Sequence, residues 1–190
     1  MALQRGPLLL LTLSLGLASA QKTLEEVPVQ PGFDAQKVEG RWLTIQLATS
    51  DTLLVSPEDP LRLALHSIRT WNRDLEFVLF WTGKGVCKGL NVTVHPTGPH
   101  GQYQGFFEGG GRMFVRFVST DYSSLILYVR FEDGGEVTSL WALLARRVLR
   151  DPKWLGRYQG YVREFQLQEA PVFNLDARCS PPAAYARAGS

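Results

Sequence analysis

The stretch Val38-Glu39-Gly40-Arg41-Trp42-Leu43-Thr44-Ile45-Gln46-Leu47-Ala48-Thr49-Ser50 decides the fold class, because it shows how the first long strand begins. After Gly40, apolar and polar residues alternate with the period of two that is typical of an extended strand. One face carries Leu43, Ile45 and Leu47, and the other carries Trp42, Thr44, Gln46 and Ala48. Glycine suits a sharp entry into a strand, since it adopts backbone angles that other residues avoid. The tryptophan would therefore stand at the start of the strand.

Seven further apolar runs follow, and residues typical of turns separate them. The runs are Leu61–Ile68, Leu75–Trp81, Val86–Val94, Tyr103–Glu108, Met113–Ser119, Tyr122–Phe131 and Val137–Arg146. Most breaks between them have the length of hairpin loops, and no helical period lies between the runs. We therefore predict an all-β fold, an eight-stranded antiparallel up-and-down β-barrel. Such a barrel has no exposed sheet edge and can enclose one small ligand.

One α-helix is predicted after the eighth strand, packed on the outside of the barrel. Asp151 suits the N-cap, and Pro152 suits the first helical position. Apolar residues then recur at spacings of three and four up to Phe165, which gives one apolar stripe. A short last strand is expected at Pro171–Leu175, and the tail at residues 181–190 is expected to be disordered.

The first 20 residues have the features of a secretory signal peptide. Arg5 precedes an apolar run that ends in Ala18-Ser19-Ala20. The run is too short to span a bilayer, so we expect a secreted domain at residues 21–180 and no stable membrane insertion; a short membrane anchor is the alternative. Removing Arg5 from the 20 basic residues leaves 19 against 18 acidic ones. This balance does not favour binding to nucleic acid or to anionic membranes.

Two cysteines and one glycosylation motif fit this extracellular setting. Cys87 and Cys179 are far apart and have no CxxC spacing, so we expect a single long-range disulfide. The three histidines are scattered, so neither a metal site nor another cofactor is implied. Asn91-Val92-Thr93 is an acceptor for N-glycosylation, which requires Asn91 to face solvent.

Three short motifs together resemble the signature motifs of the lipocalins. They are Gly40-Arg41-Trp42, Thr120-Asp121-Tyr122 and Arg146. The resemblance covers roughly residues 30–180, and the helix and the cysteine pair fit it as well. It implies that Trp42 lies across the closed bottom of the barrel and that Arg146 packs over it in a cation–π contact. The pattern is similar to the secretory subgroup that includes the epididymal lipocalins, lipocalin-type prostaglandin D synthase and neutrophil gelatinase-associated lipocalin.

The register that the resemblance implies assigns residues to the wall of the cavity. Counting from Cys87 gives as inward residues Phe77, Leu79, Trp81, Leu90, Val92 and Val94, which leaves Asn91 outside. The inward residues of the sixth strand are Met113, Val115 and Phe117. Counted from Tyr122, the inward residues of the next strand are Ile126, Tyr128 and Arg130. Counted from Trp42, the inward residues of the first strand are Thr44, Gln46 and Ala48. Alternation alone would instead place the apolar odd face of Tyr122–Phe131 in the core and Arg130 in solvent.

The expected function is to carry a small lipophilic molecule, such as a fatty acid or retinoid. Its acidic or polar head would meet Tyr128 and Arg130. One alternative is a secreted protein that binds a cell-surface receptor or another partner and needs no ligand, and another is a barrel that side chains fill completely. A lipid isomerase of the prostaglandin D synthase type is not expected. That enzyme uses a free cysteine on its second strand as the nucleophile, and this chain has no cysteine at the equivalent position, which falls at or near Ala64. His66 and Ser67 are adjacent, so they should point to opposite faces and form no nucleophile–base pair.

Overall fold

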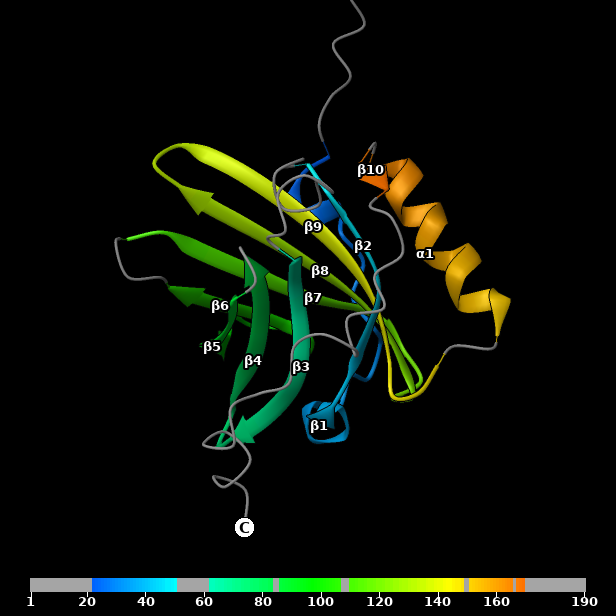
Figure 1. The fold of residues 1–190 in the computed structure, drawn as a ribbon, viewed down its shortest axis with the longest axis horizontal. Coiled ribbons are helices and arrows are strands. Elements are labelled where there is room, and N and C mark those ends of the chain that lie inside the picture. The colour runs from blue at the N-terminus through cyan, green and yellow to red at the C-terminus, as the bar shows by residue number, and fades with distance from the viewer. Residues whose placement is uncertain are drawn as a thin grey trace, which may run out of the picture.

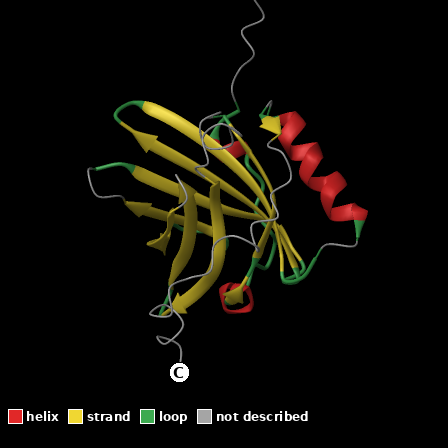
Figure 2. Ribbon diagram, viewed as in Figure 1, coloured by secondary structure: helices red, strands yellow, loops and turns green. Residues whose placement is uncertain are grey.

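A barrel of antiparallel strands, with an α-helix on its outside, makes up the protein (Figures 1 and 2). The computed structural model describes residues 22–50, 62–83, 86–106, 110–148, 151–165 and 167–169. The predicted all-β barrel with a C-terminal helix is thus confirmed. The predicted strand Pro171–Leu175, Cys179 and residues 1–20 lie outside the described part of the chain.

The strands follow one another around the barrel almost in chain order, β1-β3-β4-β5-β6-β7-β8-β9-β2-β10. Their bounds are β1 Gly40–Arg41, β2 Leu43–Thr49, β3 Arg62–Trp71, β4 Asp74–Gly83, β5 Val86–Pro96, β6 Gln102–Phe106, β7 Arg112–Thr120, β8 Ser124–Asp133, β9 Glu136–Ala145 and β10 Gln168–Glu169. The sheet has 10 strands rather than eight for two reasons. The predicted first strand is divided into β1 and β2, and β10 is a two-residue addition.

The barrel closes because its first strand changes partner at Trp42. Before this residue β1 pairs with β3, with Gly40 opposite Ile68. After it β2 pairs with β9, with Leu43 opposite Ala145. The Trp42 amide donates to the carbonyl of His66 at 2.9 Å, between the two ladders. One bent strand therefore joins the two ends of the sheet.

Arg146 holds the closed end of the barrel together. Its guanidinium lies 3.9 Å from the centroid of the Trp42 ring, as the family resemblance implies. It also donates to the backbone carbonyls of Arg41 at 2.8 Å, Lys37 at 3.0 Å and Glu39 at 2.7 Å. Gly40 has φ +103°, and a Cβ there would lie 3.1 Å from Nη1 of Arg146. A glycine is therefore needed beside the guanidinium both for its backbone angle and for its small size.

The Thr120-Asp121-Tyr122 motif forms the turn between β7 and β8 at the same end. Asp121 Oδ1 accepts from the amides of Ser123 at 2.9 Å and Ser124 at 2.7 Å. Tyr122 has φ +66°, and its hydroxyl accepts from the amide of Asp34 at 2.9 Å. Asp34 is the N-cap of the 3-10 helix η2, Ala35–Val38. The turn therefore connects the late strands to the segment that precedes Trp42.

The sheet separates two hydrophobic clusters. The inner cluster fills the barrel and includes Trp42, Phe117 and Leu127. The outer cluster lies between the barrel and the helix α1, Pro152–Glu164. There the Tyr161 ring stacks on the Trp141 ring of β9, with centroids 5.0 Å apart. The predicted N-cap is also formed, since Asp151 Oδ1 accepts from the Lys153 amide at 2.9 Å.

The predicted faces of β2 are correct only for its first half. Trp42 and Thr44 face the interior, but a register shift between Thr44 and Gln46 inserts an extra residue. A β-bulge of this kind reverses the alternation that follows. Leu47 therefore points into the barrel, and Ala48 belongs to the outer cluster with Ile45 packed against it. The predictions that Gln46 and Ala48 face inward were wrong.

The predicted faces of β8 were reversed. Leu125, Leu127 and Val129 belong to the inner cluster, whereas Ile126 and Tyr128 belong to the outer one. The Tyr128 hydroxyl lies 2.9 Å from Ser139 Oγ on β9. Arg130 lies on the outer face, where its Nε donates to Glu132 at 2.9 Å. Counting from Tyr122 failed because Tyr122 lies in the turn with a positive φ, and β8 begins only at Ser124.

Removing either partner at the closed end should destabilise the fold. We expect Trp42→Ala to lower the free energy of unfolding by about 3–5 kcal/mol. We expect Arg146→Ala to lower it by about 1.5–3 kcal/mol, through the loss of three hydrogen bonds from a charged donor to backbone carbonyls and of the contact with the Trp42 ring. Urea denaturation measures both values, and Arg147→Ala is the matched control because Arg147 is exposed. A Trp42→Ala protein that unfolds like the wild type would contradict this role.

The direction of the β8 side chains can be tested with two neighbouring positions. Val129→Asp should lower the free energy of unfolding by at least about 3 kcal/mol, because it places an unpaired carboxylate inside the barrel. Arg130→Gln should change it by no more than about 1 kcal/mol, because it alters a single half-buried ion pair on the outer face, where water still reaches both groups. Urea denaturation of both variants distinguishes the two faces. Equal effects at both positions would contradict the structure.

Candidate functional site

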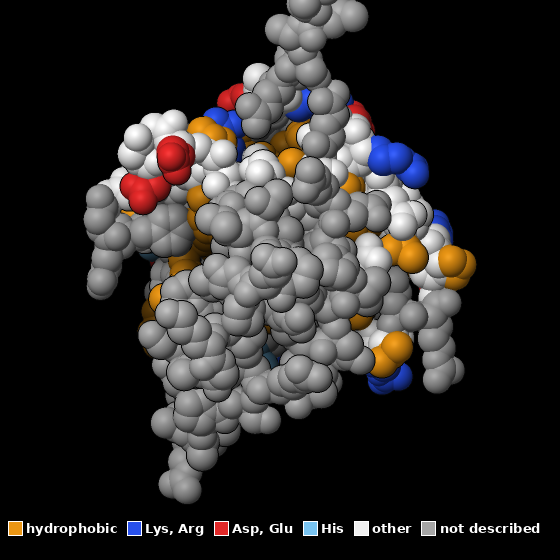
Figure 3. Space-filling view, turned by 45° about the horizontal axis from the view of Figure 1, so that its top comes forward, with side chains coloured by type: hydrophobic (Ala, Val, Ile, Leu, Met, Phe, Trp, Pro, Cys, Tyr) orange, Lys and Arg blue, Asp and Glu red, His pale blue; other side chains and the backbone are white. Residues whose placement is uncertain are grey.

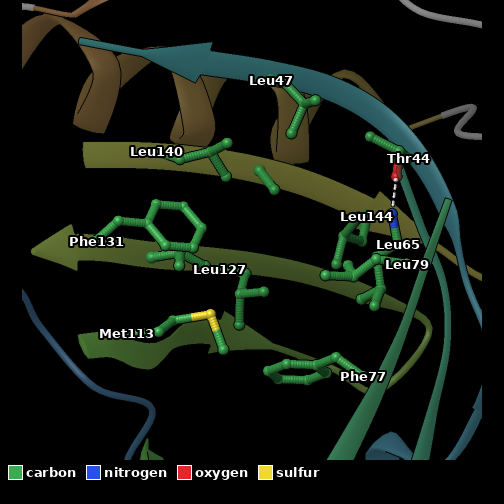
Figure 4. Close-up of a pocket in the computed structure, with 12 residues that line it drawn as sticks. Thr44, Leu47, Leu65, Phe77, Leu79, Met113, Leu127, Phe131, Leu140 and Leu144 are labelled. Atoms are coloured by element: carbon green, nitrogen blue, oxygen red, sulfur yellow. Dashed lines mark hydrogen bonds between the residues drawn. The ribbon is translucent and has the colours of Figure 1, made fainter. Parts of the chain in front are cut away.

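The interior of the barrel contains a cavity of about 50 Å³ (Figure 4). It is lined by Thr44, Leu47, Leu65, Phe77, Leu79, Met113, Leu127, Val129, Phe131, Leu140, Ala142 and Leu144. Strands β8 and β9 each contribute three alternating residues, because a side chain points inward at every second position of a strand. Strand β2 contributes Thr44 and Leu47, which share one face because of the bulge between them.

The lining of the cavity is almost entirely apolar. Among the described lining residues, Thr44 alone has a polar side-chain atom. Its hydroxyl oxygen accepts from the Leu65 amide at 3.1 Å, and its side chain points into the same space as Leu47 and Leu65 (Figure 4). None of these lining residues is ionisable. The site is therefore suited to an uncharged, apolar molecule.

Aromatic rings of the inner cluster pack together close to Tyr122, in the turn at the closed end. The rings of Phe33 and Phe117 stack with centroids 4.3 Å apart, and Tyr103 meets Phe117 edge-on at 5.7 Å. Burial raises the pKa of the Tyr103 phenol above its usual value. Phe33 comes from the segment before the barrel, so the sequence pattern of the strands did not reveal it. None of these three rings lines the cavity.

The predicted ligand-binding residues have three different locations. Phe77, Leu79 and Met113 line the cavity, whereas Val92, Val115 and Phe117 belong to the inner cluster without lining it. Leu90 lies opposite Leu79 but is 48% exposed, and the Trp81 side chain lies outside the described residues. Ile126, Tyr128 and Arg130 are on the outer face, as described above. Sequence reasoning missed the lining residues of β9, where both faces are apolar, and the odd face of β8, although the apolar alternation of β8 indicated that face.

Charged residues are on the outside of the barrel. Figure 3 shows side chains of both signs scattered around the visible face, without a continuous area of one sign among the described residues. Burial lowers the pKa of the outward Arg116, while Glu25 opposes the shift. A hydrogen bond to its own backbone is the main cause that lowers the pKa of Glu25, and the nearby Arg116 and Arg130 contribute. No arginine of the described chain faces the cavity.

The side chains of His66 and Ser67 meet, contrary to the expectation that they would point apart. His66 Nδ1 and Ser67 Oγ are 3.3 Å apart. A register shift in β3 between Leu65 and Ser67 breaks the alternation at His66. Neither residue lines the cavity, and the His66 ring packs edge-on against Phe80 at 5.1 Å. The contact therefore does not place a nucleophile beside a ligand in the barrel.

Two other features are absent from the described residues. They hold no group of three or more His, Cys, Asp or Glu side chains that could bind a metal ion. Within the same residues, no helix is both long and apolar enough to cross a membrane.

Asn91 is exposed on β5, and its Nδ2 donates to Glu76 at 3.2 Å. The described structure thus leaves the glycosylation motif accessible.

Comparison with known proteins identifies the family. The profile of the lipocalin / cytosolic fatty-acid binding protein family matches residues 39–178. Uterocalin of Equus caballus is 23% identical over 168 residues, which are 88% of this chain and 93% of uterocalin. Lipocalin-15 of Homo sapiens is 28% identical over 138 residues, or 72% of this chain and 74% of lipocalin-15.

A solved structure of bovine odorant binding protein, a deswapped triple mutant, has the same fold. It superposes with a TM-score of 0.62 and 18% sequence identity, and the match covers 77% of this chain and 99% of the bovine one. The sequence profile, the barrel with its external helix and the Trp42–Arg146 contact therefore agree, and the chain belongs to the lipocalin family.

Proposed function

We propose that this lipocalin is a secreted carrier that binds a small, neutral, apolar molecule inside its barrel. The composition of the cavity is the observation that supports this most directly, because its described lining is apolar except for Thr44. Transfer of an apolar group from water into such a site contributes about 0.8 kcal/mol per CH₂. Uterocalin and lipocalin-15 are relatives within the family, and the bovine structural neighbour is named for binding odorants.

An acidic head group does not fit this site. Arg130 and Tyr128, the residues first expected to meet it, lie on the outer face of β8. A carboxylate in the cavity would therefore lose its hydration without gaining a cation, which is costly. The proposed ligand class accordingly changes from fatty acids and similar acids to neutral molecules.

The size of the cavity further limits the ligand. Its volume of about 50 Å³ is well below the roughly 300–1,000 Å³ of pockets for drug-sized ligands. A larger ligand would have to displace lining side chains, and Met113 is suited to this because an unbranched thioether adopts many rotamers. We therefore propose a small ligand. The small volume also favours a second candidate, a secreted protein that binds a receptor or other partner and needs no ligand.

Binding rather than catalysis is proposed for the barrel. The described lining residues include no thiol, imidazole or carboxyl group that could act as nucleophile or general base. The His66–Ser67 contact lies elsewhere. Secretion, which we infer from residues 1–20, would place the protein in an oxidising fluid where Cys87 and Cys179 can pair and Asn91 can carry a glycan.

Calorimetry with octanol and octanoate at neutral pH tests the carrier function. Octanol should bind at least about tenfold more tightly, because the lining has no cation for the carboxylate. Arg130→Ala should change neither affinity. Ala142→Phe should abolish binding by filling the cavity, whereas Val137→Phe, on the exposed face of the same strand, should not.

Two outcomes would contradict this function. A preference for octanoate that disappears in Arg130→Ala would place a cation in the site. Binding of neither compound to a folded wild-type protein would remove the carrier function and favour the partner-binding alternative.

Titration of thiols tests the proposed disulfide. Protein secreted from eukaryotic cells should show no reactive thiol in denaturant before reduction and two after it. Cys87→Ser with Cys179→Ser should lower the free energy of unfolding by about 3–5 kcal/mol in the chain-entropy account, because the bond closes a long loop. Two thiols that titrate without reduction would show that the bond is absent.

A further inference from the structure

Thr44 is the one polar side chain among the described lining residues, and it is 7% exposed. It lies on β2, just after the point where the first strand changes partner from β3 to β9. Its side chain therefore lines an apolar cavity. The strand that carries it is held at the closed end of the barrel by the contacts of Trp42. A buried hydroxyl in such a place can accept hydrogen bonds at its oxygen and can donate one through its hydrogen.

The surrounding backbone fixes the position of the hydroxyl oxygen. The Trp42 amide donates to the His66 carbonyl, and the pairing of the first strand with β3 ends there, while Leu65 remains paired with Leu79 of β4 on its other side. The Leu65 amide then donates to Thr44 Oγ1 at 3.1 Å (Figure 4). The hydroxyl thus takes the place of a backbone acceptor, and this bond restricts its rotamer.

The hydrogen of the same hydroxyl remains available. A hydroxyl has one donor and two acceptor positions, and the Leu65 amide uses one acceptor position. Among the described residues, the hydrogen bond from Leu65 is the one that the Thr44 hydroxyl makes, and it donates none. A hydroxyl that already accepts a hydrogen bond is also a better donor, because hydrogen bonds in a chain polarise one another. The cavity therefore has one fixed donor and no charge.

We propose that the ligand is a neutral molecule with one hydrogen-bond acceptor, such as a ketone, aldehyde or ester, and that its oxygen accepts from Thr44. This inference rests on the proposed carrier function. A hydrocarbon would leave the Thr44 hydrogen without a partner. An alcohol could accept from it, but its own hydrogen would then face apolar side chains. A carbonyl oxygen satisfies the one donor and introduces none.

Two ligands of nearly the same shape isolate this hydrogen bond. Acetophenone has a carbonyl oxygen where α-methylstyrene has a CH₂ group. Their affinities are measured by calorimetry for wild type, Thr44→Val and Thr44→Ser. Thr44→Val keeps the shape but removes the hydroxyl, whereas Thr44→Ser keeps the hydroxyl and is the matched control. The desolvation free energy of a ligand is the same for every variant, so it cancels when the affinities of one ligand are compared between variants.

We expect Thr44→Val to weaken acetophenone binding roughly three- to tenfold and to change α-methylstyrene binding less than about twofold. Thr44→Ser should preserve the preference for acetophenone. Equal losses for the two ligands in Thr44→Val would overturn the role of Thr44 while leaving the carrier function intact. Binding of neither ligand to the wild type would overturn the carrier function itself.

A spectroscopic measurement on the wild type makes the test independent of the variants, since Thr44→Val also removes the acceptor of the Leu65 amide. The infrared carbonyl band of bound acetophenone should lie at lower frequency than in an alkane solvent, because a hydrogen bond weakens the C=O bond. A band at the alkane position would overturn the proposal even if Thr44→Val failed to fold.

Discussion

The contact between Arg146 and Trp42 is the interaction on which the rest of the barrel depends. Arg146 comes from the end of the last long strand and Trp42 from the first, so their contact joins the two ends of the sheet. The same guanidinium binds carbonyls on both sides of Gly40. Burial lowers its pKa, but the guanidinium stays charged at any physiological pH. A permanent cation with several donors is therefore well suited to close this end.

Once the sheet is closed into a barrel, its inner and outer faces are shielded from water in different ways. The inner face packs on itself inside the barrel, and the outer face of β8 and β9 is covered by α1. Two bulges next to Trp42, in β2 and β3, change which side chains face each cluster. The bulge in β2 brings Leu47 into the cavity, and the Leu65 amide donates to Thr44 just beyond the point where the first strand stops pairing with β3. The irregular positions thus produce the single polar feature of an otherwise apolar site.

The distribution of charge relates this architecture to the proposed function. Val129 and Phe131 line the cavity, whereas the ionisable residue between them, Arg130, lies on the opposite face of the strand. The interior can therefore favour neutral molecules without an unpaired buried charge. Selectivity would then come from the volume of the cavity and from one hydroxyl. The proposed carrier would then accept a narrow class of ligands.

The sequence by itself determined the all-β barrel and the external helix, because these depend on local patterns of alternation and capping. The residues of the closed end were predicted from the resemblance of three short motifs to those of the lipocalins. The register that this resemblance implies was correct for Phe77, Val92 and Met113 on β4, β5 and β7, because the alternation is regular around these positions and the register shift of β7 comes only after Phe117. Only the tertiary structure decided the inward faces of β2 and β8. A bulge after Thr44 and a left-handed Tyr122 each shift the phase of the strand that follows. Pairing with neighbouring strands sets such irregularities, so counting along one strand cannot reveal them.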